Sequence, residues 1–361
     1  MSWPSWLPLR ADLQPLSPYG APQIPAKATL NTNENPYPPS PALIEAIADE
    51  TRKVATNLNR YPDRDAILLR EKLADFINGL SGTTFDSENV WAANGSNEII
   101  QSIFFAFGKT VALGFTPSYS MHPLIAKVSG TIWVDGARNS DFSIDLNQAI
   151  SQIQEHSPTL TFVTTPNNPT GGAVSLAEIE QLAQATKAIS GLLVIDEAYA
   201  EFSTEPSAVT LIEKYPHIVV IRTMSKAFAF AGARVGYLIC NSVVKDALML
   251  VRLPYHLSAL TQAAANVALD FKEELLGYVS TLVSAREDLV SQLEKLGLTC
   301  VRSSANFILF SGFPQSAPKL WSQLLEKDVL IRDVGLPGYL RVTVGNEAEN
   351  KEFIAALKDL V

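Results

Sequence analysis

Lys226 is the residue of this sequence whose surroundings most clearly suggest chemistry. It lies in the segment Val220–Cys240, "VIRTMSKAFAFAGARVGYLIC", among alanine, phenylalanine, glycine and methionine. An ammonium group taken out of water without a partner is costly, so a lysine in such a segment needs a reason to be there. Apolar surroundings favour the neutral amine, which is a nucleophile and a base. The competing interpretation is a solvent-exposed lysine in a loop of small residues.

Polar residues follow four apolar segments that have the composition of β-strands. The segments are "VWAA", "LTFVTT", "LLVI" and "IVVIRT", and the polar residues after them are 94–97, 166–171, 196–199 and 224–226. Ligand sites in open α/β sheets form at the carboxyl ends of the strands, so these residues are expected to meet in one crevice. Ser96 and Asn97 also begin an apolar helix, whose free N–H groups could bind an anion. Taken singly, the turn at Ser96 and Asn97 is equally compatible with an ordinary helix cap, and Asp196 could likewise cap the next helix.

The elements around these residues predict an α/β protein. The chain has 361 residues, 47% of them hydrophobic, which is enough for two domains with a sizeable core. Short apolar strands alternate with helix-length segments, which indicates a mostly parallel sheet sandwiched by helices. We expect a large domain over 41–269 and a small α+β domain over 270–361. Residues 1–40, rich in proline and asparagine, are expected to form an arm that completes the small domain.

Composition excludes several classes of protein. The formal charge of -9 argues against a nucleic-acid partner. Two distant cysteines and four scattered histidines predict no metal site. No window approaches the roughly 18 apolar residues of a membrane helix. The N-terminus "MSWPSWLPLR" lacks the basic and apolar regions of a signal peptide. We therefore expect a soluble, cytoplasmic protein.

Taken together, four motifs resemble the fold-type I aminotransferases, which use pyridoxal 5′-phosphate. The motifs are "NPTG" (168–171), "DEAY" (196–199), "SKAFAFAGARVG" (225–236) and "LRVTVG" (340–345), in the order of the family and over essentially the whole chain. The resemblance implies the two-domain α/β architecture described above, with pyridoxal 5′-phosphate as the cofactor and a homodimer as the assembly.

The resemblance also implies a role for each motif residue. Lys226 would bind the cofactor aldehyde as a Schiff base and later move a proton between substrate and cofactor. Asp196 would pair with the pyridine nitrogen, and Tyr199 and Asn168 would hydrogen-bond the ring oxygen O3′. The other expected contacts are Tyr119, stacked on the ring, and Ser96, Asn97, Thr223, Ser225 and Arg234 on the phosphate. Tyr61, in "NRYPD", would reach the phosphate bound in the neighbouring subunit.

Within this family the sequence is most similar to the histidinol-phosphate aminotransferases. The shared segments include "LNTNENPYPP" (30–39), "WAANGSNEI" (91–99), "RLPYHLS" (252–258) and "VLIRDVG" (329–335). Such enzymes transfer the amino group of L-glutamate to imidazole-acetol phosphate, giving L-histidinol phosphate and 2-oxoglutarate in histidine biosynthesis. Arg341 and Arg332 would bind the substrate carboxylate or phosphate, because a guanidinium fits either anion. Tyr19, Asn33 and Tyr255 are further candidates for substrate contacts, and any of them could instead be structural.

Three other functions remain open from the sequence. An aromatic amino-acid aminotransferase shares this scaffold and its lysine, and pocket shape rather than a motif decides the substrate. Decarboxylation of a phosphorylated amino acid is possible on the same fold. A cofactor-binding regulatory module would need an appended DNA-binding segment, and the proline-rich arm is too short for a helix-turn-helix.

Overall fold

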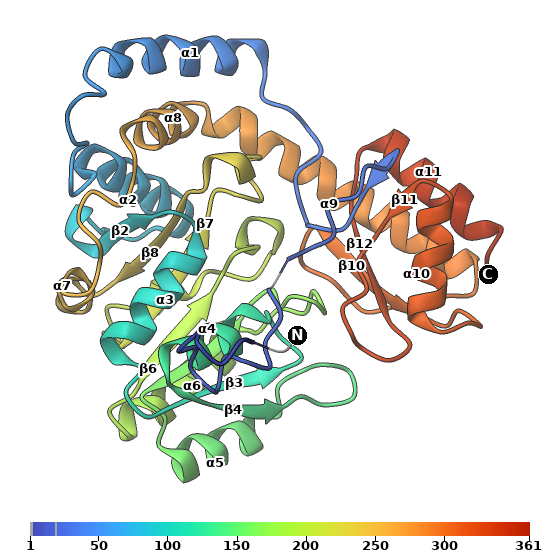
Figure 1. The fold of residues 1–361 in the computed structure, drawn as a ribbon, viewed down its shortest axis with the longest axis horizontal. Helices are drawn as coiled ribbons and strands as arrows, with labels where there is room; N and C mark the ends of the chain where they lie inside the picture. The colour runs from blue at the N-terminus through green and yellow to red at the C-terminus, as the bar shows by residue number, and fades with distance from the viewer. Residues whose placement is uncertain (1–2, 19) are drawn as a thin grey trace.

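The computed structural model describes residues 3–18 and 20–361, which form a large lobe and a smaller C-terminal lobe (Figure 1). The large lobe is built on a seven-stranded sheet with the order β2-β8-β7-β6-β5-β3-β4. Its strands are β2 (Val90–Ala93), β3 (Val111–Thr116), β4 (Ile132–Ala137), β5 (Leu160–Thr164), β6 (Leu192–Asp196), β7 (Ile218–Thr223) and β8 (Gly236–Cys240). Six strands of this sheet run in one direction, and β8, between β2 and β7, runs in the opposite direction.

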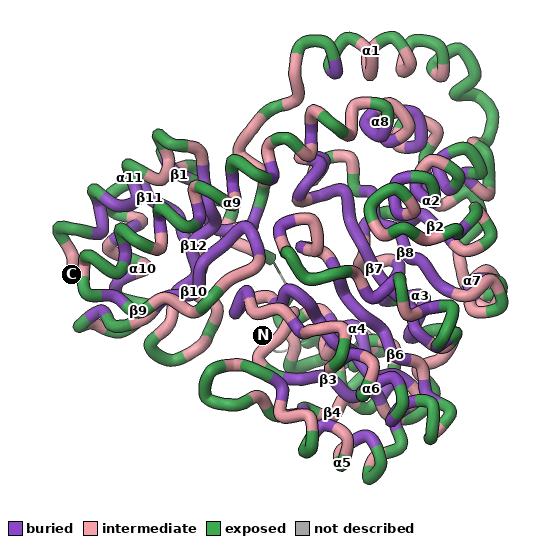
Figure 2. The backbone as a smooth tube through the Cα atoms, turned by 180° about the vertical axis from the view of Figure 1, so that it is seen from behind, coloured by how far each residue is buried: buried purple, intermediate pink, exposed green. Residues whose placement is uncertain are grey.

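Apolar cores lie on both faces of the seven-stranded sheet. Along β6, Leu193 and Ile195 belong to one buried cluster, whereas Val194, between them, belongs to another. Successive side chains of a strand point to opposite faces, so both faces of the sheet are covered. Figure 2 shows the strands buried inside a layer of helices whose outer sides are exposed. This arrangement explains why the strands appear in the sequence as continuous apolar runs.

Eight α-helices belong to the large lobe within the described chain. They are α1 (Pro41–Ala55), α2 (Ile67–Ser81), α3 (Ser96–Phe107), α4 (Met121–Ser129), α5 (Leu146–His156), α6 (Leu176–Ala188), α7 (Ser242–Met249) and α8 (Ala259–Asp270). Of these, α1 packs on α8 rather than on the sheet. Local sequence signals fix several of their ends. At α6, for example, Ser175 and Glu178 form a reciprocal capping box, which satisfies N–H groups that the first turn leaves unpaired.

The smaller lobe contains a three-stranded antiparallel sheet with the order β12-β10-β9. Its elements are α9 (Lys272–Lys295), β9 (Thr299–Cys300), β10 (Phe307–Ser311), α10 (Ala317–Glu326), β11 (Val329–Leu330), β12 (Leu340–Thr343) and α11 (Glu347–Lys358). The N-terminal arm adds a short strand, β1 (Ala28–Thr29), parallel to β11. Ala28 and Leu30 are buried in the same apolar cluster as Leu340. Residues 28–30 of the arm are thus part of the smaller lobe.

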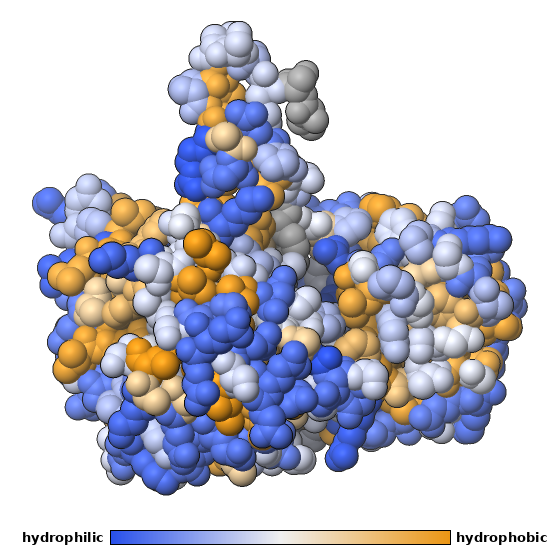
Figure 3. All heavy atoms as spheres, turned by 90° about the horizontal axis from the view of Figure 1, so that it is seen from below, coloured by the Kyte–Doolittle hydropathy of each residue, from blue (hydrophilic) through white to orange (hydrophobic). Residues whose placement is uncertain are grey.

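The outer surface is largely hydrophilic on the face shown in Figure 3, where apolar residues form small separate groups. None of the helices among the described residues combines the length and the apolar character that crossing a membrane requires.

Candidate active site

A pocket of about 490 Å³ lies where the large lobe, the smaller lobe and the arm meet. The carboxyl ends of β5, β6 and β7 supply its floor, where the sequence placed the polar residues. Thirteen of the residues expected from the sequence line this pocket: Asn33, Ser96, Asn97, Tyr119, Asn168, Asp196, Tyr199, Thr223, Ser225, Lys226, Arg234, Arg332 and Arg341. These thirteen residues, the first and last of which are 308 positions apart in the sequence, are therefore brought together in one cavity. The roles assigned to them stay predictions.

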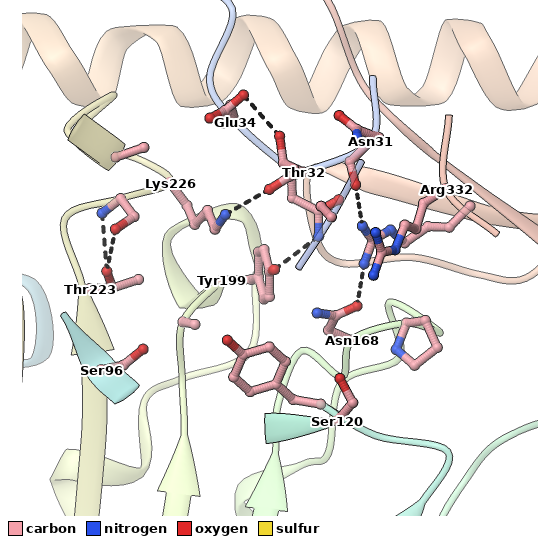
Figure 4. Close-up of a pocket in the computed structure, with 18 of the residues that line it drawn as sticks. Asn31, Thr32, Glu34, Ser96, Ser120, Asn168, Tyr199, Thr223, Lys226 and Arg332 are labelled. Atoms are coloured by element: carbon pink, nitrogen blue, oxygen red, sulfur yellow. Dashed lines mark hydrogen bonds between the residues drawn. The ribbon is translucent and has the colours of Figure 1, made fainter. Parts of the chain in front are cut away.

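Lys226 follows β7 and points into the pocket toward the arm (Figure 4). Its Nζ donates a hydrogen bond to the carbonyl oxygen of Thr32 at 2.9 Å. Burial is the largest of the causes that together lower the pKa of Lys226 to about 8; the positive charges of Arg341 and Arg234 add to it, and Glu34 opposes it. At neutral pH a useful fraction of this lysine is consequently the neutral amine, which answers why a lysine lies in an apolar segment.

Asp196 ends β6 and is held by a histidine that the sequence analysis did not single out. His122 Nε2 lies 3.0 Å from Asp196 Oδ2, and both side chains are buried. The backbone N–H of Ala198 donates to the other carboxylate oxygen at 3.2 Å. The ring of His122 packs against the aromatic rings of Tyr119, Trp133 and Phe162. The carboxylate therefore has one orientation, with its position set from two sides.

The N-terminus of α3 and Arg234 form a cradle suited to a phosphate group. A Cβ atom on Gly95 would lie 2.6 Å from Arg234 Nη2, and one on Gly236 would lie 2.4 Å from the backbone nitrogen of Ser96. The two glycines thus let the guanidinium and the helix N-terminus approach closely. Thr223 Oγ1 donates to Ser225 Oγ at 2.9 Å beside them. Helix N–H groups, hydroxyls and a guanidinium are the donors that a phosphate dianion requires, so these residues fit the expected cofactor.

Two arginines extend from adjacent backbone positions of the smaller lobe. Arg332 and Arg341 form an antiparallel bridge, with backbone hydrogen bonds of 3.0 and 2.9 Å. Side chains of residues paired in this way emerge on the same face, so both guanidinium groups reach the pocket. Arg341 is further held by the carbonyl of Asn31 at 2.8 Å, by the side chain of Asn168 and by the ring of Phe307.

Two of the described residues expected from the sequence, Tyr61 and Tyr255, are not among those that line the pocket. Tyr61 and Tyr255 stack on each other on the surface, with ring centroids 4.5 Å apart. Tyr61 is 79% exposed. Tyr19 lies outside the described residues. A contact of Tyr61 with a neighbouring subunit therefore stays a prediction.

Two functional groups lacked a usable signal in the sequence. Thr32 contacts Lys226 through its backbone carbonyl, an atom that every residue has. His122 carries no motif, although it lies three residues after Tyr119 and hence on the same side of the chain as the expected stacking tyrosine. Among the described residues, no group of histidine, cysteine, aspartate and glutamate side chains is placed to hold a metal ion.

The fold and the site define an aminotransferase. The family described as aminotransferase class I and II matches residues 25–357, and the chain belongs to this family. The expected fold class and enzyme class are thereby confirmed.

Individual relatives carry a more specific name. A histidinol-phosphate aminotransferase of Nocardia farcinica is 53% identical over 351 residues, which is 96% of this chain and 90% of the relative. A protein of the same name from Mycolicibacterium smegmatis is 51% identical over 98% of this chain and 93% of its own length.

Solved structures show the same fold. A histidinol-phosphate aminotransferase from Sinorhizobium meliloti, in complex with pyridoxal 5′-phosphate, has a TM-score of 0.85 at 23% identity, covering 98% of this chain and 97% of that one. An aspartate aminotransferase variant from Thermus thermophilus has a TM-score of 0.84 at 22% identity, covering 98% and 99%. The fold alone consequently does not select the substrate.

Proposed function

We propose that this protein is a histidinol-phosphate aminotransferase, which transfers the amino group of L-glutamate to imidazole-acetol phosphate in histidine biosynthesis. Its cofactor is pyridoxal 5′-phosphate, and the two half-reactions alternate in a ping-pong order. Relatives that are more than half identical over nearly the whole chain carry this name. The observation that carries the proposal is the pairing of Arg332 with Arg341 at one wall of the pocket.

The paired arginines suit a substrate that ends in a phosphate. Glutamate presents a carboxylate where histidinol phosphate presents a carbon bearing a phosphate, so one subsite must bind either anion. A phosphate dianion carries more charge and offers more acceptor oxygens than a carboxylate, and a second guanidinium matches this difference. An unphosphorylated aromatic substrate would draw no such benefit from Arg332.

Each group of the pocket then has a place in the reaction. The bound cofactor supplies an electron-withdrawing ring, which stabilises negative charge on the substrate carbon. Lys226 carries the proton to and from that carbon, since its amine is partly neutral. Asp196, which lies 3.0 Å from His122, would pair with the pyridine nitrogen and favour its protonated form. The cradle of Ser96 and Arg234 would hold the cofactor phosphate, and Tyr199 and Asn168 would hydrogen-bond the ring oxygen.

A half-reaction screen tests the proposed substrate. The yellow holoenzyme is mixed separately with histidinol phosphate, phenylalanine and glutamate, and the conversion of the cofactor to its amine form is followed by absorbance. We expect histidinol phosphate and glutamate to convert the cofactor faster than phenylalanine at equal concentration. Faster conversion by phenylalanine than by histidinol phosphate would favour the aromatic aminotransferase instead. A protein that stays colourless when the cofactor is added would contradict both functions.

We further propose that two chains form a homodimer through the surface around Tyr61. Residues 57–68 and 250–260 adjoin there, because Arg252 donates to the carbonyl of Arg64 at 2.7 Å. Leu250 and Leu253, on this surface, are 86% and 73% exposed. Neighbouring large apolar side chains in contact with water are typical of a protein–protein interface. Light scattering coupled to size-exclusion chromatography measures the mass, and a monomer of 39.2 kDa would contradict this assembly.

The expected division into domains is also a proposal. We assign residues 1–40 to the arm, 41–269 to the cofactor-binding domain and 270–361 to the small domain of a soluble, cytoplasmic enzyme. Separate apolar clusters in the two lobes support this division. Helix α9 packs on both, since Leu275 and Leu282 lie in the cluster of the large lobe and Leu289 and Leu293 in that of the smaller lobe. Limited proteolysis that cuts near residues 40 and 270 would agree with the proposed boundaries.

A further inference from the structure

We propose that Asn33, in the N-terminal arm, is a positioning residue that directs the hydroxyl hydrogen of Tyr199 toward the cofactor. The proposal rests on the proposed function as far as the cofactor is concerned. Asn33 Nδ2 donates to the hydroxyl oxygen of Tyr199 at 2.9 Å, the bond drawn as a dashed line ending on Tyr199 in Figure 4. The side chains of both residues are buried, with 1% of Asn33 and 5% of Tyr199 exposed.

Thr343, on β12, sets the orientation of the Asn33 amide. The backbone N–H of Asn33 donates to Thr343 Oγ1 at 3.0 Å, and Thr343 Oγ1 donates to Asn33 Oδ1 at 3.1 Å. A hydroxyl has a single hydrogen, and here it is given to the amide oxygen. If the amide were turned over, its NH₂ group and the backbone N–H of Asn33 would both donate to Thr343 Oγ1. The hydroxyl hydrogen of Thr343 would then have no acceptor within this group of residues. The amide oxygen therefore faces Thr343, and the NH₂ group faces Tyr199.

The backbone of Asn33 helps to hold this geometry. Its φ is +56°, in the left-handed region that asparagine adopts more readily than most residues. Its carbonyl oxygen accepts a hydrogen bond from Asn306 Nδ2 at 3.1 Å. The amide oxygen, the amide nitrogen, the main-chain N–H and the main-chain carbonyl of Asn33 each form a hydrogen bond with another residue. This favours a positioning role for Asn33 over a direct contact with the substrate.

The consequence for Tyr199 follows from the chemistry of a phenol. An oxygen that accepts an N–H from Asn33 keeps its own hydrogen for donation to another acceptor. The ring of Tyr199 is fixed edge-on against Phe307, with centroids 5.1 Å apart. The phenol is thereby held as a donor toward the ring oxygen of the cofactor rather than as an acceptor from it.

Asn33 also connects the two lobes. Thr343, its partner, lies two residues after Arg341 on β12, and Phe307 contacts both Arg341 and Tyr199. The strand that carries an anion-binding arginine is thus joined through Asn33 to the tyrosine of the cofactor-binding lobe. A shift of β12 relative to β6 would change the hydrogen bond that Tyr199 accepts from Asn33.

Spectral titration of the holoenzyme without substrate tests the proposal. A hydrogen bond from Tyr199 stabilises negative charge on the ring oxygen, so weakening it raises the pH at which the cofactor absorbance changes. Asn33→Gly removes the amide without strain at positive φ. We expect this variant to raise the midpoint by roughly half to one pH unit, the worth of one hydrogen bond. Thr343→Val, which frees the amide to turn over, should give a smaller shift in the same direction.

The double variant Asn33→Gly, Tyr199→Phe shows whether Asn33 acts through the hydroxyl of Tyr199 or by another route. In a Tyr199→Phe background, Asn33→Gly should cause no further shift, because its effect passes through the hydroxyl. A shift of equal size in that background, or none in the single variant, would overturn the proposal, as would a rise in KM for histidinol phosphate with an unchanged midpoint. Should Asn33→Gly not bind the cofactor, Asn33→Ser is measured in the same way. A wild-type protein without a cofactor band would instead refute the proposed function.

Discussion

Replacing Lys226 with methionine should make the cofactor-free protein more stable at neutral pH. Desolvation of Lys226 at the wall of the pocket, together with the positive charges of Arg341 and Arg234, lowers its pKa from 10.5 to about 8. The difference of 2.5 units corresponds to roughly 3 kcal/mol at 1.36 kcal/mol per unit. Below pH 8 the folded protein bears this cost of holding the charge. Lys226→Met removes the charge together with one hydrogen bond to Thr32, worth about 1 kcal/mol, so a net gain of roughly 2 kcal/mol remains.

The pH dependence separates the charge from the packing. As the pH rises from 8 to 10.5, the folded wild-type protein loses a proton that the unfolded chain keeps, so its stability rises. The advantage of Lys226→Met should therefore fall by roughly 3 kcal/mol over this window. Urea unfolding followed by tryptophan fluorescence, at one protein concentration and several pH values, measures both proteins. Other titrating groups are common to the two and cancel in the difference.

A lysine whose pKa is raised rather than lowered by folding serves as the control. Exposed Lys214 pairs with Glu180, and that hydrogen bond raises the pKa of Lys214. The wild-type protein should then lose, rather than gain, stability relative to Lys214→Met as the pH rises toward 11. A difference between wild type and Lys226→Met that stays constant from pH 7 to 10.5 would show that Lys226 titrates normally. The explanation of its nucleophilic amine by burial would then be wrong.

Three further substitutions test the substrate subsite, a buried ion pair beside the site and the expected contact of Tyr61. Arg332→Ala should lower kcat/KM for histidinol phosphate by about 10- to 100-fold more than for phenylalanine, since charge-assisted hydrogen bonds are lost only with the phosphate; equal losses would remove the case for a phosphorylated substrate. Glu197→Ala should destabilise the protein by about 3–5 kcal/mol in urea unfolding, because it leaves the buried Arg222 without its closest carboxylate, at 2.8 Å; a loss below 1 kcal/mol would contradict this. Tyr61→Ala should weaken cofactor binding in equilibrium dialysis while the dimer persists, and unchanged affinity would exclude Tyr61 from the phosphate site.

Much of the site was predictable because parallel strands bring their carboxyl ends to one edge. Asp196 ends β6 and Lys226 follows the neighbouring strand β7, and both line the pocket as the sequence suggested. The phosphate cradle was predictable for a similar reason, since Gly95 and Ser96 open a helix directly after β2. In each case a local pattern and a rule of topology are sufficient, and no detail of side-chain packing is needed.

The remaining contacts depend on packing between distant segments. His122 meets Asp196 only because α4 lies over the end of β6, 74 residues apart in the sequence. Arg341 and Asn31 are 310 residues apart and meet through a backbone carbonyl. Neither a helical histidine on an apolar face nor a carbonyl oxygen has a sequence signature. The surface around Tyr61 is a further case, since its interpretation requires a second chain.

The short polar segment 31–33 of the arm has more influence on the site than its irregular sequence suggests. The carbonyl of Asn31 holds Arg341, the carbonyl of Thr32 holds Lys226, and the amide of Asn33 holds Tyr199. These partners bind the substrate anion, move the proton and contact the cofactor ring in the proposed reaction. Because the arm is joined to β11 in the smaller lobe, a displacement of that lobe would reach all three partners together. If the substrate anion binds at Arg341 as proposed, its site shares segment 31–33 with Lys226 and Tyr199, an arrangement that residues of the large lobe alone do not provide.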